Sequence, residues 1–63
     1  MQYRIISTTD HQHRGKIIDF DIDNPGDIFL GDITIETLFV TVNDDGTLTV
    51  GNPNYLLTLR GVD

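Results

Sequence analysis

The chain has 63 residues, no cysteine and a formal net charge of −6. A chain this short forms one domain and buries only roughly 60% of the surface that its unfolded form exposes. Without cysteine, disulfides and thiolate metal sites are excluded. We expect residues 1–63 to be a complete gene product that folds as a single β domain.

The composition favours strands over helices. The chain has no Ala, one Glu and one Lys, but eight Ile, four Val and eight Thr. β-branched side chains pack well on a pleated surface, whereas Ala, Glu and Lys favour helices. No stretch of ten residues has a helical pattern, so the sequence predicts an all-β fold.

The first half of the chain predicts two strands before residue 24. Residues 2–8 form the first, and a polar connection over 9–15 carries both histidines. Residues 16–22 are the clearest strand, because apolar residues alternate there with aspartates, the period of a half-buried strand. Asn24-Pro25-Gly26-Asp27 then predicts a type II turn, with Gly26 at the position that needs a positive φ.

The second half predicts three or four more strands. Residues 28–30 form a short apolar strand that Gly31-Asp32 ends, and residues 33–42 form the longest strand. The apolar parity changes near Glu36-Thr37, which predicts a β-bulge. The remaining elements are a hairpin turn at 43–46, a strand at 47–50, a turn at 51–54 and a last strand at 55–60.

Five or six short strands with a turn about every ten residues are typical of small antiparallel folds. The sequence therefore predicts a small antiparallel barrel or a two-sheet sandwich, SH3-like or OB-like in size. The expected bulge favours the barrel, because tight closure needs a bent strand.

The charge is concentrated in the middle of the chain. Residues 17–45 hold eight acids and no base. Direct binding to nucleic acid or to anionic membranes is disfavoured, because both need Lys and Arg. The predicted acidic face consists of Asp19, Asp21, Asp23, Asp44 and Asp45.

Two interpretations of this acidic face stay open. It keeps a small protein soluble, or it binds a basic protein surface as an inhibitor. In a sharper form of the second, Asp19, Asp21 and Asp23 lie about 6.6 Å apart along one strand face and imitate a phosphate backbone. The alternating acids of this segment also resemble the start of a calcium-binding loop. Such a loop needs a glycine and a bidentate acid at the positions that Asn24 and Leu30 occupy here.

The only metal-like cluster is Asp10-His11-Gln12-His13. Two histidines one residue apart on an extended segment place both rings on one side, which suits zinc. The polar surroundings favour an exposed loop instead, so His11 and His13 are weak candidates and we expect no metal and no cofactor.

Catalysis is not expected either. Ser7 is the only serine, and its neighbours Asp10 and His11 are too close in sequence to build a triad across a fold. A β domain of this size also has little room for a pocket of several hundred Å³.

The apolar pattern predicts an interface. Neighbouring residues of a strand point to opposite faces, and five apolar doublets or triplets occur. One member of each fills the core, and a single small core cannot bury the other set. The predicted interface residues are Ile6, Ile17, Phe29, Phe39 and Leu56.

From this surplus of apolar residues we expect a non-enzymatic accessory subunit that docks on a larger assembly, such as a phage capsid or tail, or that associates with itself. A sandwich in which the doublets straddle both sheets is the alternative. Residues 1–7 do not resemble a signal peptide, so we expect an intracellular or virion-associated protein.

Overall fold

The computed structural model of the chain describes residues 1–62; Asp63 lies outside the described residues. Within this range the protein contains seven strands and no helix, which confirms the predicted all-β class. None of the described residues therefore belongs to a helix that could cross a membrane. The strands are β1 (Gln2–Thr8), β2 (Ile17–Asp19), β3 (Ile28–Leu30), β4 (Ile33–Ile35), β5 (Phe39–Val42), β6 (Leu48–Asn52) and β7 (Tyr55–Gly61).

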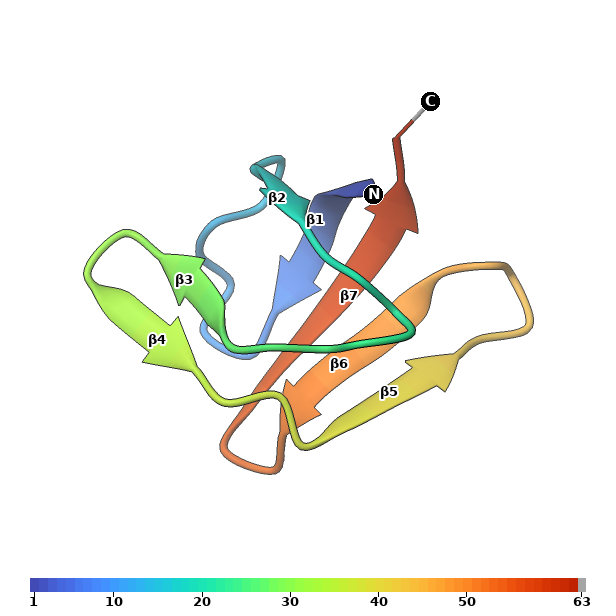
Figure 1. Cartoon of the computed structure of the whole chain (residues 1–63). Helices are drawn as coiled ribbons and strands as arrows, with labels where there is room; N and C mark the ends of the chain where they lie inside the picture. Colours follow the sequence, from blue (N-terminus) through green and yellow to red (C-terminus); the bar gives the residue numbers. More distant parts are fainter. Residues whose placement is uncertain (63) are drawn as a thin grey trace.

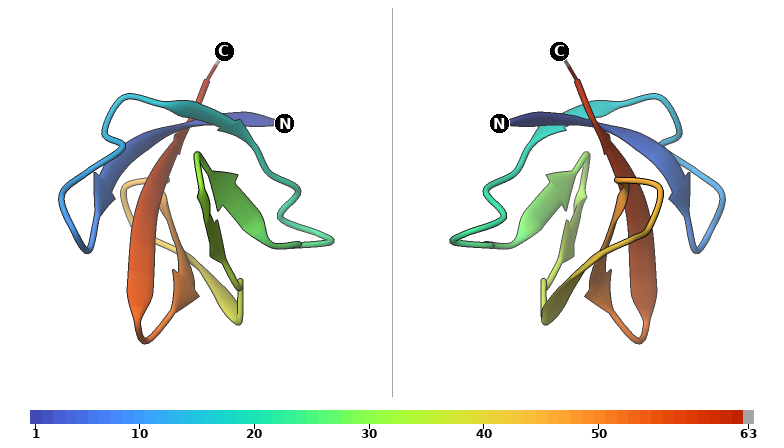
Figure 2. Two further views of the ribbon diagram at one scale, coloured as in Figure 1. Left: turned by 90° about the vertical axis from the view of Figure 1, so that its left-hand side faces the viewer. Right: turned by 90° about the vertical axis from the view of Figure 1, so that its right-hand side faces the viewer.

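The strands form two antiparallel sheets (Figure 1). The larger sheet has the order β2-β1-β7-β6-β5, and β3 and β4 form a separate hairpin. Figure 2 shows the larger sheet curled around this hairpin, which lies at its concave side. Over residues 1–62 the strands do not close into a barrel, because β2 and β5 end the larger sheet without pairing with the hairpin.

The core lies between the two sheets and follows from the alternation of apolar residues. Buried and exposed side chains alternate in the first half of β1, at Tyr3 and Ile5, and in the middle of β7, at Leu57 and Leu59, as the period of two requires. Tyr3 packs edge-on against Phe20, with ring centroids 6.1 Å apart. The buried apolar residues come from both sheets and from the loop after β2: Tyr3, Ile5, Phe20, Ile28, Leu30, Ile35, Leu48, Val50, Leu57 and Leu59.

The predicted strand over 16–22 is shorter than expected. β2 ends at Asp19, and only the backbone N–H of Phe20 still bonds to the sheet, donating to the carbonyl of Met1. Ile22, expected inside, is exposed. The type II turn is also wrong, because Gly26 does not have the positive φ that such a turn needs.

The parity change near Glu36-Thr37 marks a change of sheet rather than a bulge. The single strand predicted over 33–42 is two strands: β4 pairs with β3, and β5 pairs with β6 in the larger sheet. A register shift does occur in β1, where the pairing with β7 skips Ile6 between Ile5 and Ser7. A bulge was therefore expected in the wrong strand.

The hairpin turns follow the sequence closely. Gly31-Asp32 connects β3 and β4, and Gly31 has a φ of 61°, as a two-residue turn with glycine first requires. Gly46 has a φ of 87° in the predicted turn before β6. Pro53 and Asn54 join β6 to β7, with the side-chain oxygen of Asn52 accepting the backbone N–H groups of Asn54 and Tyr55.

Candidate interaction surface

The histidine segment does not have the shape that a zinc site needs. His11 and His13 both lie in the left-handed region, with φ of 61° and 66°, so the extended segment on which the zinc interpretation depended does not form. Nδ1 of His13 lies 2.9 Å from Nζ of Lys16. Among residues 1–62 no three His, Asp or Glu side chains gather as a metal site would require.

Asp10, the third ligand considered for zinc, holds the connection between β1 and β2 in place. Its Oδ1 accepts the backbone N–H of Gln12 at 3.1 Å and the hydroxyl of Tyr55 at 2.8 Å, and the hydroxyl of Thr8 lies 2.8 Å away. The Gln12 N–H is the largest cause that lowers the pKa of Asp10. Burial, followed by the bond to Asp10, raises the pKa of Tyr55. These contacts give Asp10 a structural role.

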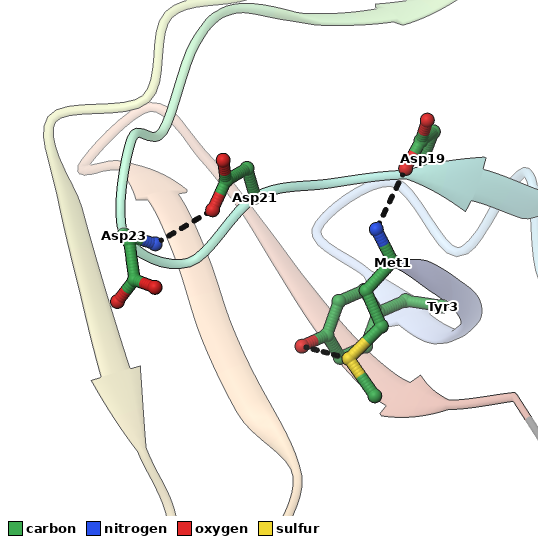
Figure 3. A network of polar contacts seen from close by, with 5 residues as sticks. All are labelled: Met1, Tyr3, Asp19, Asp21 and Asp23. Carbon is green, nitrogen blue, oxygen red and sulfur yellow. Dashed lines mark hydrogen bonds and ion pairs between the residues drawn. The ribbon is translucent and has the colours of Figure 1, made fainter.

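All five residues of the predicted acidic face are exposed, but they do not form a regular row. Since β2 ends at Asp19, Asp21 and Asp23 lie in the following loop and share no strand face with it. Figure 3 shows two local contacts: Asp19 pairs with the N-terminal amine at 3.0 Å, and Asp21 accepts the backbone N–H of Asp23 at 3.0 Å. The even spacing proposed for phosphate mimicry is absent.

Asp44 and Asp45 lie in the turn between β5 and β6. The carboxylate of Asp45 accepts the hydroxyl of Thr47 at 2.6 Å and its backbone N–H at 3.0 Å. The hydroxyl bond is the first cause that lowers the pKa of Asp45. Asp45 therefore shapes the turn and also adds negative charge at the end of β5.

The predicted apolar interface residues are distributed over three places. Phe29 is 71% exposed on the β3–β4 hairpin, and Ile17 is 48% exposed on β2 at one end of the larger sheet. Ile6, the bulge residue of β1, is only partly buried. Phe39 and Leu56 are both 38% exposed; Phe39 lies on β5 at the other end of the larger sheet, and Leu56 lies on the central strand β7.

Phe39 and Leu56 share one cross-strand row. Phe39 is opposite Gly51, and Gly51 is opposite Leu56, so the two side chains flank a residue that has none. Gly51 is buried. Residues of one cross-strand row share a face of the sheet, so Phe39 and Leu56 lie on the same face, two strands apart.

Two apolar residues near β5 are exposed although their parity predicts burial. Leu38 and Val42 alternate with the predicted interface residue Phe39 and should face inward, yet Leu38 is 62% and Val42 is 63% exposed. Val42 pairs with Leu48 and has core parity, but β5 is the last strand of the sheet and the hairpin does not cover its end. Parity shows the face of a strand and not its distance from the sheet edge, so no local signal identifies these residues.

The two ends of the larger sheet differ in charge. Near β2, Arg4 is directly opposite both Ile17 and Arg60, so two arginines lie beside the exposed isoleucine. Near β5, Glu36 precedes the strand and Asp44 and Asp45 follow it. The apolar surface at β5 consists of Leu38 and Val42, which have the same strand parity, and of Phe39 on the opposite face; acidic residues lie at both ends of this segment.

The described residues 1–62 enclose no pocket for a small molecule. Comparisons with protein-family models, with curated proteins and with solved structures found no match for this chain. The function must therefore be argued from the surfaces alone.

Proposed function

We propose that this chain is a non-enzymatic interaction protein, a small accessory subunit that docks on a protein partner through the apolar surface at β5. The observation that carries the proposal is the exposure of three apolar residues within five consecutive positions at the edge of the larger sheet: Leu38 and Val42, which share one strand parity, and Phe39, which lies on the other face. Contiguous exposed apolar groups mark interaction sites in soluble proteins. A virion surface, such as a phage capsid or tail, remains the assembly that we propose.

The small size of the domain also supports docking on a protein partner. A domain of this length gains stability when a partner covers apolar area that its own core cannot include. In this proposal the scaffold is a two-sheet sandwich, SH3-like in size, since residues of both sheets share one core.

Sedimentation velocity and light scattering test the proposal, with the protein alone and with candidate virion proteins, at low and high salt. We expect association that persists at high salt and is lost in the double variant L38N/V42N. The matched control is Phe29→Asn, which removes an equally exposed side chain from the other sheet. Association that is weakened by Phe29→Asn and unchanged in L38N/V42N would refute docking at β5.

The alternative function, an acidic inhibitor of a basic protein, retains the exposure of its carboxylates. It loses the regular row on which phosphate mimicry was based, because Asp21 and Asp23 lie outside β2. Salt distinguishes the two functions. Exposed charges that lie farther apart than the Debye length, about 8 Å at physiological ionic strength, are largely screened, and added salt shortens this length. Binding that disappears at high salt and is insensitive to L38N/V42N would favour the inhibitor.

A further inference from the structure

β5 is an edge strand whose outer side is open. It pairs with β6 on one side, and within residues 1–62 no strand pairs with the other. Its side chains agree with an uncovered edge, because Phe39, Thr41 and Val42 are exposed and Val40 is only partly buried. An edge of this kind offers backbone N–H and C=O groups to a further strand.

The register identifies the free backbone groups. The N–H of Asn43 donates to the carbonyl of Thr47, which sets the phase of the β5–β6 ladder. Hydrogen-bonded pairs alternate along an antiparallel ladder, so Thr41 bonds to β6, whereas the N–H and C=O groups of Val40 and Val42 point outward. A docking strand would therefore bond to Val40 and Val42.

β5 also lacks most of the devices that protect edge strands. Its four residues, Phe39–Val42, include no charge and no proline, and its pairing with β6 has no register shift. Charges, prolines, bulges and short length are the usual protections. β5 is short, and one irregularity precedes it, where the N–H of Leu38 donates to the carbonyl of Gly51, the residue paired with Phe39. β2, at the opposite edge, is shorter still and carries Asp19, which is paired with the N-terminal amine.

Charge then selects the occupant. Glu36 lies before β5, Asp44 and Asp45 lie after it, and the chain has no base between residues 17 and 59. In a two-fold pairing of β5 with a second copy, the acidic turn of each molecule would lie beside Glu36 of the other. Like charges placed across strands are destabilising, so a basic partner fits this edge better than a second copy.

We propose that the outer edge of β5 binds an extended segment of a partner protein as an additional strand of the larger sheet. The segment has apolar or β-branched residues at alternate positions and Lys or Arg at its ends. Backbone groups of Val40 and Val42 provide its hydrogen bonds, and the basic ends face Glu36 and the Asp44-Asp45 turn. Strand addition of this kind gains affinity from the main chain and specificity from alternate side chains. The inference rests on the proposed docking function and adds its geometry and the chemistry of its partner.

Titration of the ¹⁵N-labelled full chain with synthetic peptides tests this binding mode by NMR. The probe is acetyl-Lys-Lys-Val-Thr-Val-Thr-Val-Lys-amide. We expect saturable shifts centred on the amides of Val40 and Val42 and slower hydrogen exchange of both. In a second peptide, two alternate backbone nitrogens on the side that faces β5 are methylated. This peptide should bind at least about tenfold more weakly. A peptide with Glu in place of Lys should also lose affinity.

A protein variant provides an independent test. Val42→Pro removes an N–H that points outward, so the β5–β6 ladder keeps its bonds, as proline on edge strands allows. The comparison variant Val42→Thr changes the side chain but keeps the N–H. We expect the proline variant to lose at least about tenfold more peptide affinity than the threonine variant; equal losses would overturn the backbone bond. If the proline variant does not fold, the methylated peptide decides the question.

The other outcomes separate this inference from the proposed function. Equal binding of methylated and unmethylated peptides would overturn strand addition and leave apolar docking intact. If no peptide binds, while L38N/V42N still abolishes association with a protein partner, strand addition is likewise overturned and apolar docking stays intact. Equal binding of the Glu peptide would overturn the basic partner. Protection of Val40 and Val42 in concentrated protein without peptide would identify a second copy as the occupant and overturn the partner proposed.

Discussion

Gly51 is the position where a single methyl group should damage this fold most. It lies in β6 with a φ of 122°, a backbone conformation that residues with a side chain rarely adopt. A Cβ built there would overlap the backbone carbonyl oxygen of Tyr55, at the start of β7. Neither obstacle can be relieved by turning a side chain, because the group in the way is backbone.

The cost of Gly51→Ala can be estimated from these two causes. A non-glycine residue in a sparsely populated backbone region costs on the order of 1–3 kcal/mol, and shifting β7 to admit the methyl adds to it. We expect a loss of about 3 kcal/mol of unfolding free energy. The total for a chain of this length is only about 3–9 kcal/mol, so the variant should lose between about one third and all of its stability.

Urea denaturation followed by circular dichroism measures this loss, with Gly26→Ala as the matched control. Gly26 has an ordinary φ and nothing within 4 Å of its built Cβ, so its substitution should change stability by no more than about 0.5 kcal/mol. In a thermal scan the Gly51→Ala midpoint should fall by about 12 °C or more. Equal stability of the two variants would refute the close approach of β6 and β7 at this hairpin.

Three further predictions concern buried and acidic groups. The hydroxyl of Thr37 is buried without a hydrogen-bond partner in the described structure, so Thr37→Val should leave the free energy of unfolding, measured by urea denaturation, unchanged or raise it by about 1 kcal/mol at most. Asp10 and Asp45 have lowered pKa values because their carboxylates accept bonds from Gln12 and Thr47. Their contribution to folding stability is therefore present above the unfolded pKa of 3.8 and is lost as the pH falls through the lower folded pKa. Acid titration followed by circular dichroism should show this loss. Asp45→Asn should make stability less dependent on pH below 4 than in the wild type, and an unchanged acid profile would contradict the role given to that carboxylate.

The sequence predicts most of the larger sheet because local patterns determine it. β1 and β7 follow from alternation of apolar residues, and the hairpin turns before β6 and β7 follow from glycine and asparagine at positions that need their backbone preferences. Ile5 and Leu57, the doublet partners of Ile6 and Leu56, are buried for the same reason. Each of these features depends only on residues within a few positions.

The errors concern properties that depend on distant parts of the chain. The parity change at Glu36-Thr37 is real, but a local pattern cannot distinguish a bulge within one sheet from a step between two sheets. Leu38 and Val42 have core parity and are exposed because β5 is the last strand of its sheet. Strand order is set by pairing across the whole chain, which no short window contains. The surface that we propose as functional therefore depends on the feature that the sequence reveals least.

The acidic residues and the apolar edge, which the sequence suggests as rival explanations, act together in the proposed binding mode. An apolar edge strand on a neutral protein would pair readily with copies of itself. Here a net charge of −6 opposes the approach of a second copy, and the acids nearest to β5 lie at both of its ends. The same charges attract a strand with basic ends, so one set of carboxylates would both prevent self-pairing and select the partner.

Removing these carboxylates should then have two linked effects. The triple variant E36Q/D44N/D45N should gain self-association, measured by sedimentation velocity, and it should lose its preference for the Lys peptide over the Glu peptide. A variant that loses this preference and stays monomeric would show that the short length of β5, and not its charge, keeps the edge free.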